Sequence, residues 1–113
     1  MHEYGIVQAL IERVEELARE RRATAVQGVL VSIGELSGVE PGLLATAYAT
    51  FRERTVCERA DLTILPVAAR WSCPRCRREI ARGAILSCPD CGVPALLSAG
   101  DGIVLERIEM EVA

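Results

Sequence analysis

The chain has 113 residues, of which half are apolar, and its formal net charge is −3. This length suits one domain with at most a small additional module. The 13 basic residues are all arginine and face 16 acidic ones, and a net-acidic chain binds nucleic acid weakly unless its arginines cluster. The start Met1-His2-Glu3-Tyr4 lacks a basic leader, and no apolar run could span a bilayer. We therefore expect a cytoplasmic protein that has no membrane partner.

The first part of the chain predicts a helix followed by a strand. From about Glu3 to Arg22 apolar residues recur at intervals of three and four, which indicates one buried stripe of an amphipathic helix. Its members are Ile6, Val7, Leu10, Ile11, Val14, Leu17 and Ala18. Residues 26–33 alternate in the manner of a half-buried strand. Its inward residues would be Val29, Val31 and Ile33.

A second helix is predicted to begin near Glu40, with Pro41 at its first position, where a missing N–H costs nothing. It should end around residues 54–55. Its expected apolar stripe is Leu43, Leu44, Ala47, Tyr48 and Phe51. A strand over residues 62–67 should follow, ended or bent near Pro66.

The last predicted strand covers residues 103–112. Ile108, Met110 and Val112 would share one face. Because Ile103 and Leu105 are out of step with them, we expect a bulge near residues 106–107.

Two Cys-x-x-Cys pairs interrupt this pattern. Cys73-Pro74-Arg75-Cys76 and Cys88-Pro89-Asp90-Cys91 are separated by eleven residues. A gap of two lets both thiolates of a turn face one ion, and two such turns supply a tetrahedron of sulfur, the closed geometry of a structural zinc site. Proline pre-sets each turn, and Gly92 permits a positive φ after the second pair.

The element order predicts an α+β fold in which two helices pack on one face of a small three-stranded sheet, with an inserted four-cysteine zinc-ribbon module. We assign residues 1–70 plus 100–113 to the helix–sheet domain and residues 71–99 to the zinc-binding module. The fifth cysteine, Cys57, stands apart from the pairs, and we interpret it as a small buried apolar residue.

The N-terminus is a second candidate metal site. His2 is the single histidine and lies beside the α-amine. The Met1 amine, the deprotonated His2 amide and the His2 imidazole can chelate one ion in fused rings, and the Glu3 amide or a carboxylate can complete a plane. Planar nitrogen donors favour Ni(II) or Cu(II), whereas zinc prefers a tetrahedron.

Four segments together resemble the HypA family of hydrogenase maturation nickel metallochaperones. They are the Met1-His2-Glu3 start, Ile33-Gly34-Glu35-Leu36-Ser37, the paired cysteine turns, and Ile108-Glu109-Met110-Glu111-Val112. The resemblance runs essentially from residue 1 to residue 112. The Met-His-Glu start combined with two Cys-x-x-Cys pairs is far more specific than either motif alone.

The resemblance implies nickel binding at Met1, His2 and Glu3, and a structural zinc at the four paired cysteines, Cys73, Cys76, Cys88 and Cys91. It implies work with the GTPase accessory protein HypB to load nickel into the [NiFe]-hydrogenase large subunit, and some relatives also serve urease. Glu40 falls where some relatives carry an acidic residue near the nickel site, so it is a candidate extra ligand beside its plainer role as a helix cap. A homodimer is left open.

Two other classes compete with this interpretation. A zinc-ribbon nucleic-acid module would use Arg75, Arg77, Arg78 and Arg82, but the acidic net charge and the scarcity of stacking aromatics disfavour it. A rubredoxin-like electron carrier would hold iron at the cysteines and be visibly red. An enzyme is the least expected class, because no nucleophile–base pair can be identified.

Overall fold

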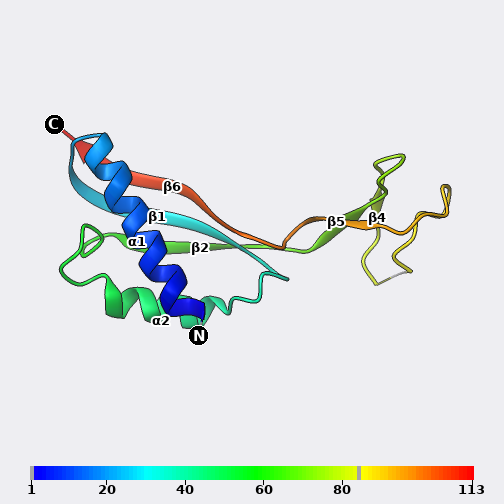
Figure 1. Cartoon of the computed structure of the whole chain (residues 1–113), viewed down its shortest axis with the longest axis horizontal. Helices are drawn as coiled ribbons and strands as arrows, with labels where there is room; N and C mark the ends of the chain where they lie inside the picture. Colours follow the sequence, from blue (N-terminus) through cyan, green and yellow to red (C-terminus); the bar gives the residue numbers. More distant parts are fainter. Residues whose placement is uncertain (1, 84) are drawn as a thin grey trace.

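The computed structural model describes residues 2–83 and 85–113 of an elongated molecule with principal extents of 55 × 30 × 17 Å. Two three-stranded sheets lie at opposite ends of the long axis, and both helices cover the first sheet (Figure 1). The elements are α1 (His2–Glu20), β1 (Ala23–Gly34), α2 (Pro41–Phe51), β2 (Asp61–Val67), β3 (Arg70–Ser72), β4 (Glu79–Ile80), β5 (Leu96–Ala99) and β6 (Ile103–Val112). No helix in the described part of the chain is long and apolar enough to cross a membrane.

The first sheet confirms the predicted three strands. Its order is β2-β1-β6, with β1 parallel to β2 and antiparallel to β6. Pro66 lies within β2, which ends one residue later at Val67. An edge strand tolerates a residue without an N–H, because only one of its sides joins the ladder.

The predicted bulge in β6 is also present. Leu30 of β1 pairs with Arg107, whereas the next residue, Val31, pairs with Leu105, so Glu106 is the extra residue. The bulge restores the phase of the strand, because apolar residues on both sides of it pack against the same core. These residues are Ile103, Leu105, Ile108 and Met110. Val112, predicted on this face, is 55% exposed at the end of the strand.

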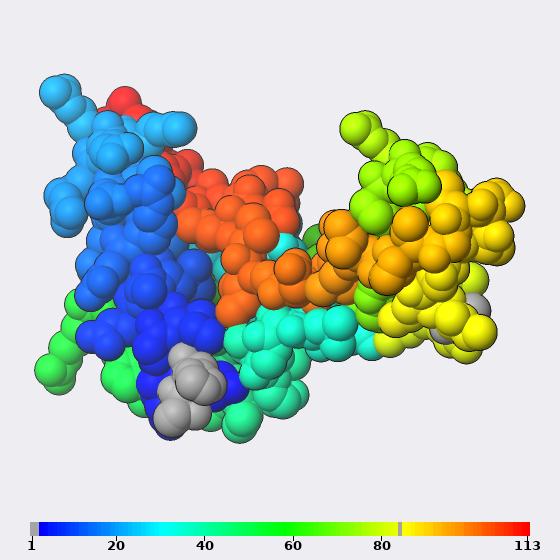
Figure 2. Space-filling model, turned by 45° about the vertical axis from the view of Figure 1, so that its right-hand side comes forward, coloured from blue at the N-terminus to red at the C-terminus, as the bar shows by residue number. Residues whose placement is uncertain are grey.

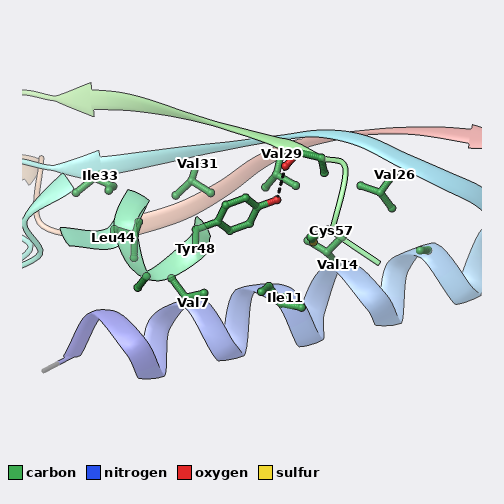
Figure 3. Packing of buried hydrophobic residues seen from close by; sticks show 13 residues of the cluster. Val7, Ile11, Val14, Val26, Val29, Val31, Ile33, Leu44, Tyr48 and Cys57 are labelled. Atoms are coloured by element: carbon green, nitrogen blue, oxygen red, sulfur yellow. Dashed lines mark hydrogen bonds between the residues drawn. The ribbon is translucent and has the colours of Figure 1, made fainter. Parts of the chain in front are cut away.

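Both helices bury their apolar sides against one face of this sheet, as predicted. Figure 3 shows side chains of α1, α2 and β1 converging in one cluster, with the Tyr48 ring between the helices and the sheet. The Tyr48 hydroxyl donates a 2.7 Å hydrogen bond to the carbonyl of Ala60. Cys57 is fully buried in this cluster, which confirms its interpretation as a buried apolar residue.

The limits and burial of α2 differ partly from prediction. The Glu40 carboxylate caps the helix, accepting hydrogen bonds from the N–H groups of residues 42 and 43. The helix ends at Phe51, three residues earlier than expected. Leu43 and Phe51, predicted to be in the stripe, are 56% and 44% exposed. Phe51 instead packs edge-on against Tyr4 at the surface, with ring centroids 5.2 Å apart.

The second sheet was not predicted. Its order is β4-β3-β5 and both pairings are antiparallel. Trp71 lies in its central strand, opposite Ile80 on one side and Leu97 on the other. Strands of two to four residues are too short to show a period in the sequence, which explains why these elements were missed. We call residues 70–99 the cysteine module and the remainder the helix–sheet lobe.

Candidate metal centres

The four paired cysteines meet at one point of the cysteine module. The sulfur atoms of Cys73, Cys76, Cys88 and Cys91 all lie within 4.8 Å of one another. The Cys76 and Cys88 sulfurs are 3.7 Å apart. A zinc–sulfur bond of about 2.3 Å implies tetrahedral edges of about 3.8 Å, so the observed spacing fits a single tetrahedral ion.

Each cysteine pair forms the same hydrogen-bonded turn. In the first, the N–H of Arg77 bonds to the Cys73 carbonyl at 2.8 Å, and in the second the N–H of Gly92 bonds to the Cys88 carbonyl at 2.9 Å. The positive φ predicted for Gly92 is confirmed at 69°. Backbone N–H groups also point at the first sulfur of each pair, including that of Cys76 toward Cys73 at 3.4 Å. Sulfur that accepts such bonds is prepared to be a thiolate ligand.

The electrostatics of the cluster favour a divalent cation. The backbone N–H of Cys76 holds the pKa of Cys73 at about 6, and that of Cys91 lowers the pKa of Cys88. Burial, together with the neighbouring sulfurs, raises the pKa of Cys91 to about 12. Four thiolates therefore cannot coexist here unless a cation offsets their charge, and the donor set fits zinc or another soft divalent ion.

The arginines of the module are largely committed to ion pairs. Arg78 bonds to Asp90 at 2.5 Å, and Arg82 bonds to Glu35 of the helix–sheet lobe. These contacts neutralise two of the four arginines that a nucleic-acid interface would use, and leave the exposed Arg75 and Arg77.

Of the N-terminal candidates, the structure describes Glu3, which lies in the helix–sheet lobe in the first turn of α1, near the start of α2 (Figure 1). Met1 and the side chain of His2 lie outside the described residues. Hydrogen bonds lower the pKa of Glu3, chiefly one from its own backbone N–H and to a lesser degree one from the backbone N–H of Glu40. Glu3 and Glu40, far apart in the sequence, are therefore neighbours at the start of both helices.

Comparison with known proteins decides the family. The chain matches, over residues 1–110, the family described as "Hydrogenase/urease nickel incorporation, metallochaperone, hypA". The chain belongs to the HypA family. The family description names a metallochaperone rather than an enzyme.

Individual relatives agree over their full lengths. The chain is 41% identical to the hydrogenase maturation factor HypA of Aquifex aeolicus, covering 99% of both sequences, and 38% identical to that of Shewanella oneidensis, covering 100% of this chain and 98% of the relative. The solution structure of the nickel metallochaperone HypA from Helicobacter pylori is similar with a TM-score of 0.75 at 30% identity, covering 98% of each chain. A second HypA solution structure gives 0.83 at 32% identity, covering 100% of this chain and 98% of the other.

The structure can be compared with the site residues that the sequence predicts for this member of the HypA family. The four cysteines predicted to be ligands are brought together, while Cys57 lies apart from them in the core. Glu35 lies in one of the segments that resemble the HypA family, but the sequence predicts no contact for its side chain. The position of Glu35 between two parts of the molecule depends on long-range contacts, so no local signal could have revealed it.

Proposed function

We propose that this chain binds Ni(II) at its N-terminus and helps insert it into the large subunit of [NiFe]-hydrogenase during maturation, with Zn(II) as a structural ion at the four cysteines. The observation that carries the proposal is the match over residues 1–110 to a nickel-incorporation family by a chain that begins Met-His-Glu.

The nickel ligands in this proposal are the Met1 amine, the His2 amide and imidazole, and Glu3. The first N–H groups of a helix have no intrahelical acceptor, so amides at the start of α1 can enter a chelate without breaking the helix. The proximity of Glu3 to the start of α2 makes Glu40 a second carboxylate near the site. Because both oxygens of Glu40 already cap α2, it ranks behind Glu3 as a ligand.

The zinc ligands are Cys73, Cys76, Cys88 and Cys91. A bound zinc ion there would supply folding energy to the cysteine module, whose own apolar cluster is small. With four sulfur ligands the coordination is closed, and no position remains for a reacting water. Residues 71–99 would then be a metal-stabilised unit beside the domain formed by residues 1–70 plus 100–113.

The partners follow from the family resemblance. We expect the GTPase HypB and the hydrogenase large subunit to bind this chain, and the family description also includes urease. The elongated shape supports separate docking of partners, because α1 begins in one lobe and the cysteines lie in the module at the other end (Figure 2).

The proposal is tested by complementation of a bacterial strain that lacks its own HypA. The untagged wild-type chain should restore hydrogenase activity and nickel in the large subunit, whereas His2→Gln should restore neither. Glu12→Gln, an exposed change on α1, is the matched control and should behave as wild type. Full restoration by His2→Gln would refute delivery from the N-terminus.

A further inference from the structure

Residues 34–36, at the end of β1 and directly after it, lie where the helix–sheet lobe meets the cysteine module. Two stretches of chain connect these parts: residues 67–69 lead into the module, and residues 100–102 lead back from it. Backbone N–H groups of residues 34–36 donate hydrogen bonds to both. Gly34 donates to Gly102 at 2.8 Å and Leu36 donates to Gly100 at 2.7 Å, both on the return connection. Glu35 donates to Val67 at 2.8 Å, at the end of the outgoing strand.

Two glycines let these backbones cross in direct contact. A Cβ on Gly34 would lie 2.3 Å from the backbone of Gly100, and a Cβ on Gly100 would lie 2.6 Å from the Cα of Ala69. Gly100 also has φ of 92°, which favours glycine. The crossing fixes where the module is attached. Its contacts reach only Ala69 and Gly100, the residues next to the two ends of the second sheet, and so do not hold the sheet itself.

The Glu35 side chain reaches past this crossing. Its Oε1 accepts a 2.9 Å hydrogen bond from the backbone N–H of Ala69, and both its oxygens accept from the Arg82 guanidinium, with Nη1–Oε1 at 2.6 Å. The same guanidinium lies 5.8 Å from the Trp71 ring centre, over the central strand of the second sheet. Arg82 holds the pKa of Glu35 at about 2, so this carboxylate is ionised at neutral pH.

Among the described residues, the other ion pairs of the module do not connect the two parts. Arg70–Glu79 joins β3 to β4, and Arg78–Asp90 joins the two cysteine turns. Glu35–Arg82 instead joins the lobe to the module across 47 positions of sequence. In Figure 2 the turquoise segment that follows β1 extends to the yellow part of the module.

We propose that Glu35 is a releasable latch that sets the orientation of the cysteine module relative to the helix–sheet lobe. The paired, bidentate geometry with Arg82 makes the contact directional, and the bond to Ala69 anchors it on the segment that connects β2 to β3. The side chains of Glu35 and Arg82 are 39% and 55% exposed, so salt or a charged group of a partner can compete for either one. Release would let the module turn at the junctions 69–70 and 99–100, which lie at the edge of the second sheet, while the backbone crossing holds.

The test is NMR on the full-length, zinc-loaded protein. Residual dipolar couplings and ¹⁵N relaxation should give one alignment tensor and one tumbling time for both parts of the wild type. In Glu35→Gln and in Arg82→Gln, the lobe and the module should each show an alignment tensor and a tumbling time of their own. Because they break the same contact, the double variant should show no further change. High salt should move the wild type in the same direction.

Glu79→Gln is the matched control, since it removes another exposed ion pair, Arg70–Glu79, that lies inside the module. It should keep a single tensor. All variants should retain one zinc per chain and the wild-type spectrum of the helix–sheet core. A single tensor in both Glu35→Gln and Arg82→Gln would overturn the latch, and so would loss of zinc from both, because Glu35 would then support the metal site itself. Neither readout uses nickel, so failure here is distinct from failure of the proposed function.

Discussion

Arg77 and Gly92 adopt the same left-handed conformation, with φ of 66° and 69°, four residues after the first cysteine of their respective turns. Each donates its N–H to the carbonyl of that cysteine. The two turns are therefore copies of one structure, but the first carries a residue with a Cβ in a conformation that glycine adopts without strain.

This relationship predicts opposite effects of two substitutions. Gly92→Ala should destabilise the module by about 1–2 kcal/mol through backbone strain alone, because no atom lies within 4 Å of the added Cβ. Arg77→Gly should relieve strain and stabilise the module by up to about 1 kcal/mol. Hydrogen exchange of the module amides would measure both. Equal destabilisation by the two changes would show that the turns are not equivalent.

Removal of one sulfur ligand should affect only one part of the molecule. Cys76→Ser should lose zinc and loosen residues 71–94, because the small apolar cluster of the module cannot hold it alone. The helix–sheet lobe has its own core and should remain protected. Hydrogen exchange read residue by residue checks this, with Cys57→Ser as a core control that should spare zinc. Unfolding of the entire chain in Cys76→Ser would contradict the division into two units.

The core of the helix–sheet lobe should be sensitive to cavities and less sensitive to loss of one hydrogen bond. Leu44 is fully buried, so Leu44→Ala should cost about 2–5 kcal/mol. Tyr48→Phe removes the bond to the Ala60 carbonyl, which still accepts from Arg52 at 3.1 Å, so the cost should be about 1 kcal/mol. Urea unfolding measures both values. A larger loss for Tyr48→Phe than for Leu44→Ala would contradict this packing.

The cysteine module should not bind nucleic acid tightly. With Arg78 and Arg82 paired to carboxylates, binding to duplex DNA at physiological salt should be no tighter than the non-specific range of about 10⁻⁴ to 10⁻⁶ M. Fluorescence anisotropy over a salt series is the measurement. Submicromolar binding with a steep salt dependence would favour the zinc-ribbon alternative.

The sequence predicted what depends on local pattern. The stripe of α1 and the alternation of β1 repeat at the periods of a helix and a strand, so these elements could be located. The metal cluster could be located because the two-residue gap within each cysteine pair is the spacing of a metal-binding turn. The bulge at Glu106 was predictable because Ile103 and Leu105 broke the phase of the strand. Glu40 as a helix cap followed from its place before Pro41.

The remainder depends on contacts between distant residues. Phe51 fits the helical stripe, but its place beside Tyr4 is decided by how α1 crosses α2. The strands of the second sheet are formed by pairing around Trp71 and have no periodic signal of their own. Likewise, the contact between Glu35 and Arg82 spans two parts of the fold, and no motif encodes it.

The central claim, nickel at the N-terminus, is most directly tested by nickel titration of the untagged wild type, of His2→Gln, and of a chain extended by one residue before Met1. Nickel must displace protons from an imidazole with a reference pKa near 6.5, an amine near 7.7–8.0, and an amide. Wild-type affinity should therefore fall steeply from about pH 8 to about pH 6. Both altered chains should lose the site while keeping zinc. Wild-type nickel affinity in the extended chain would contradict the account, because the α-amine could not then be a ligand.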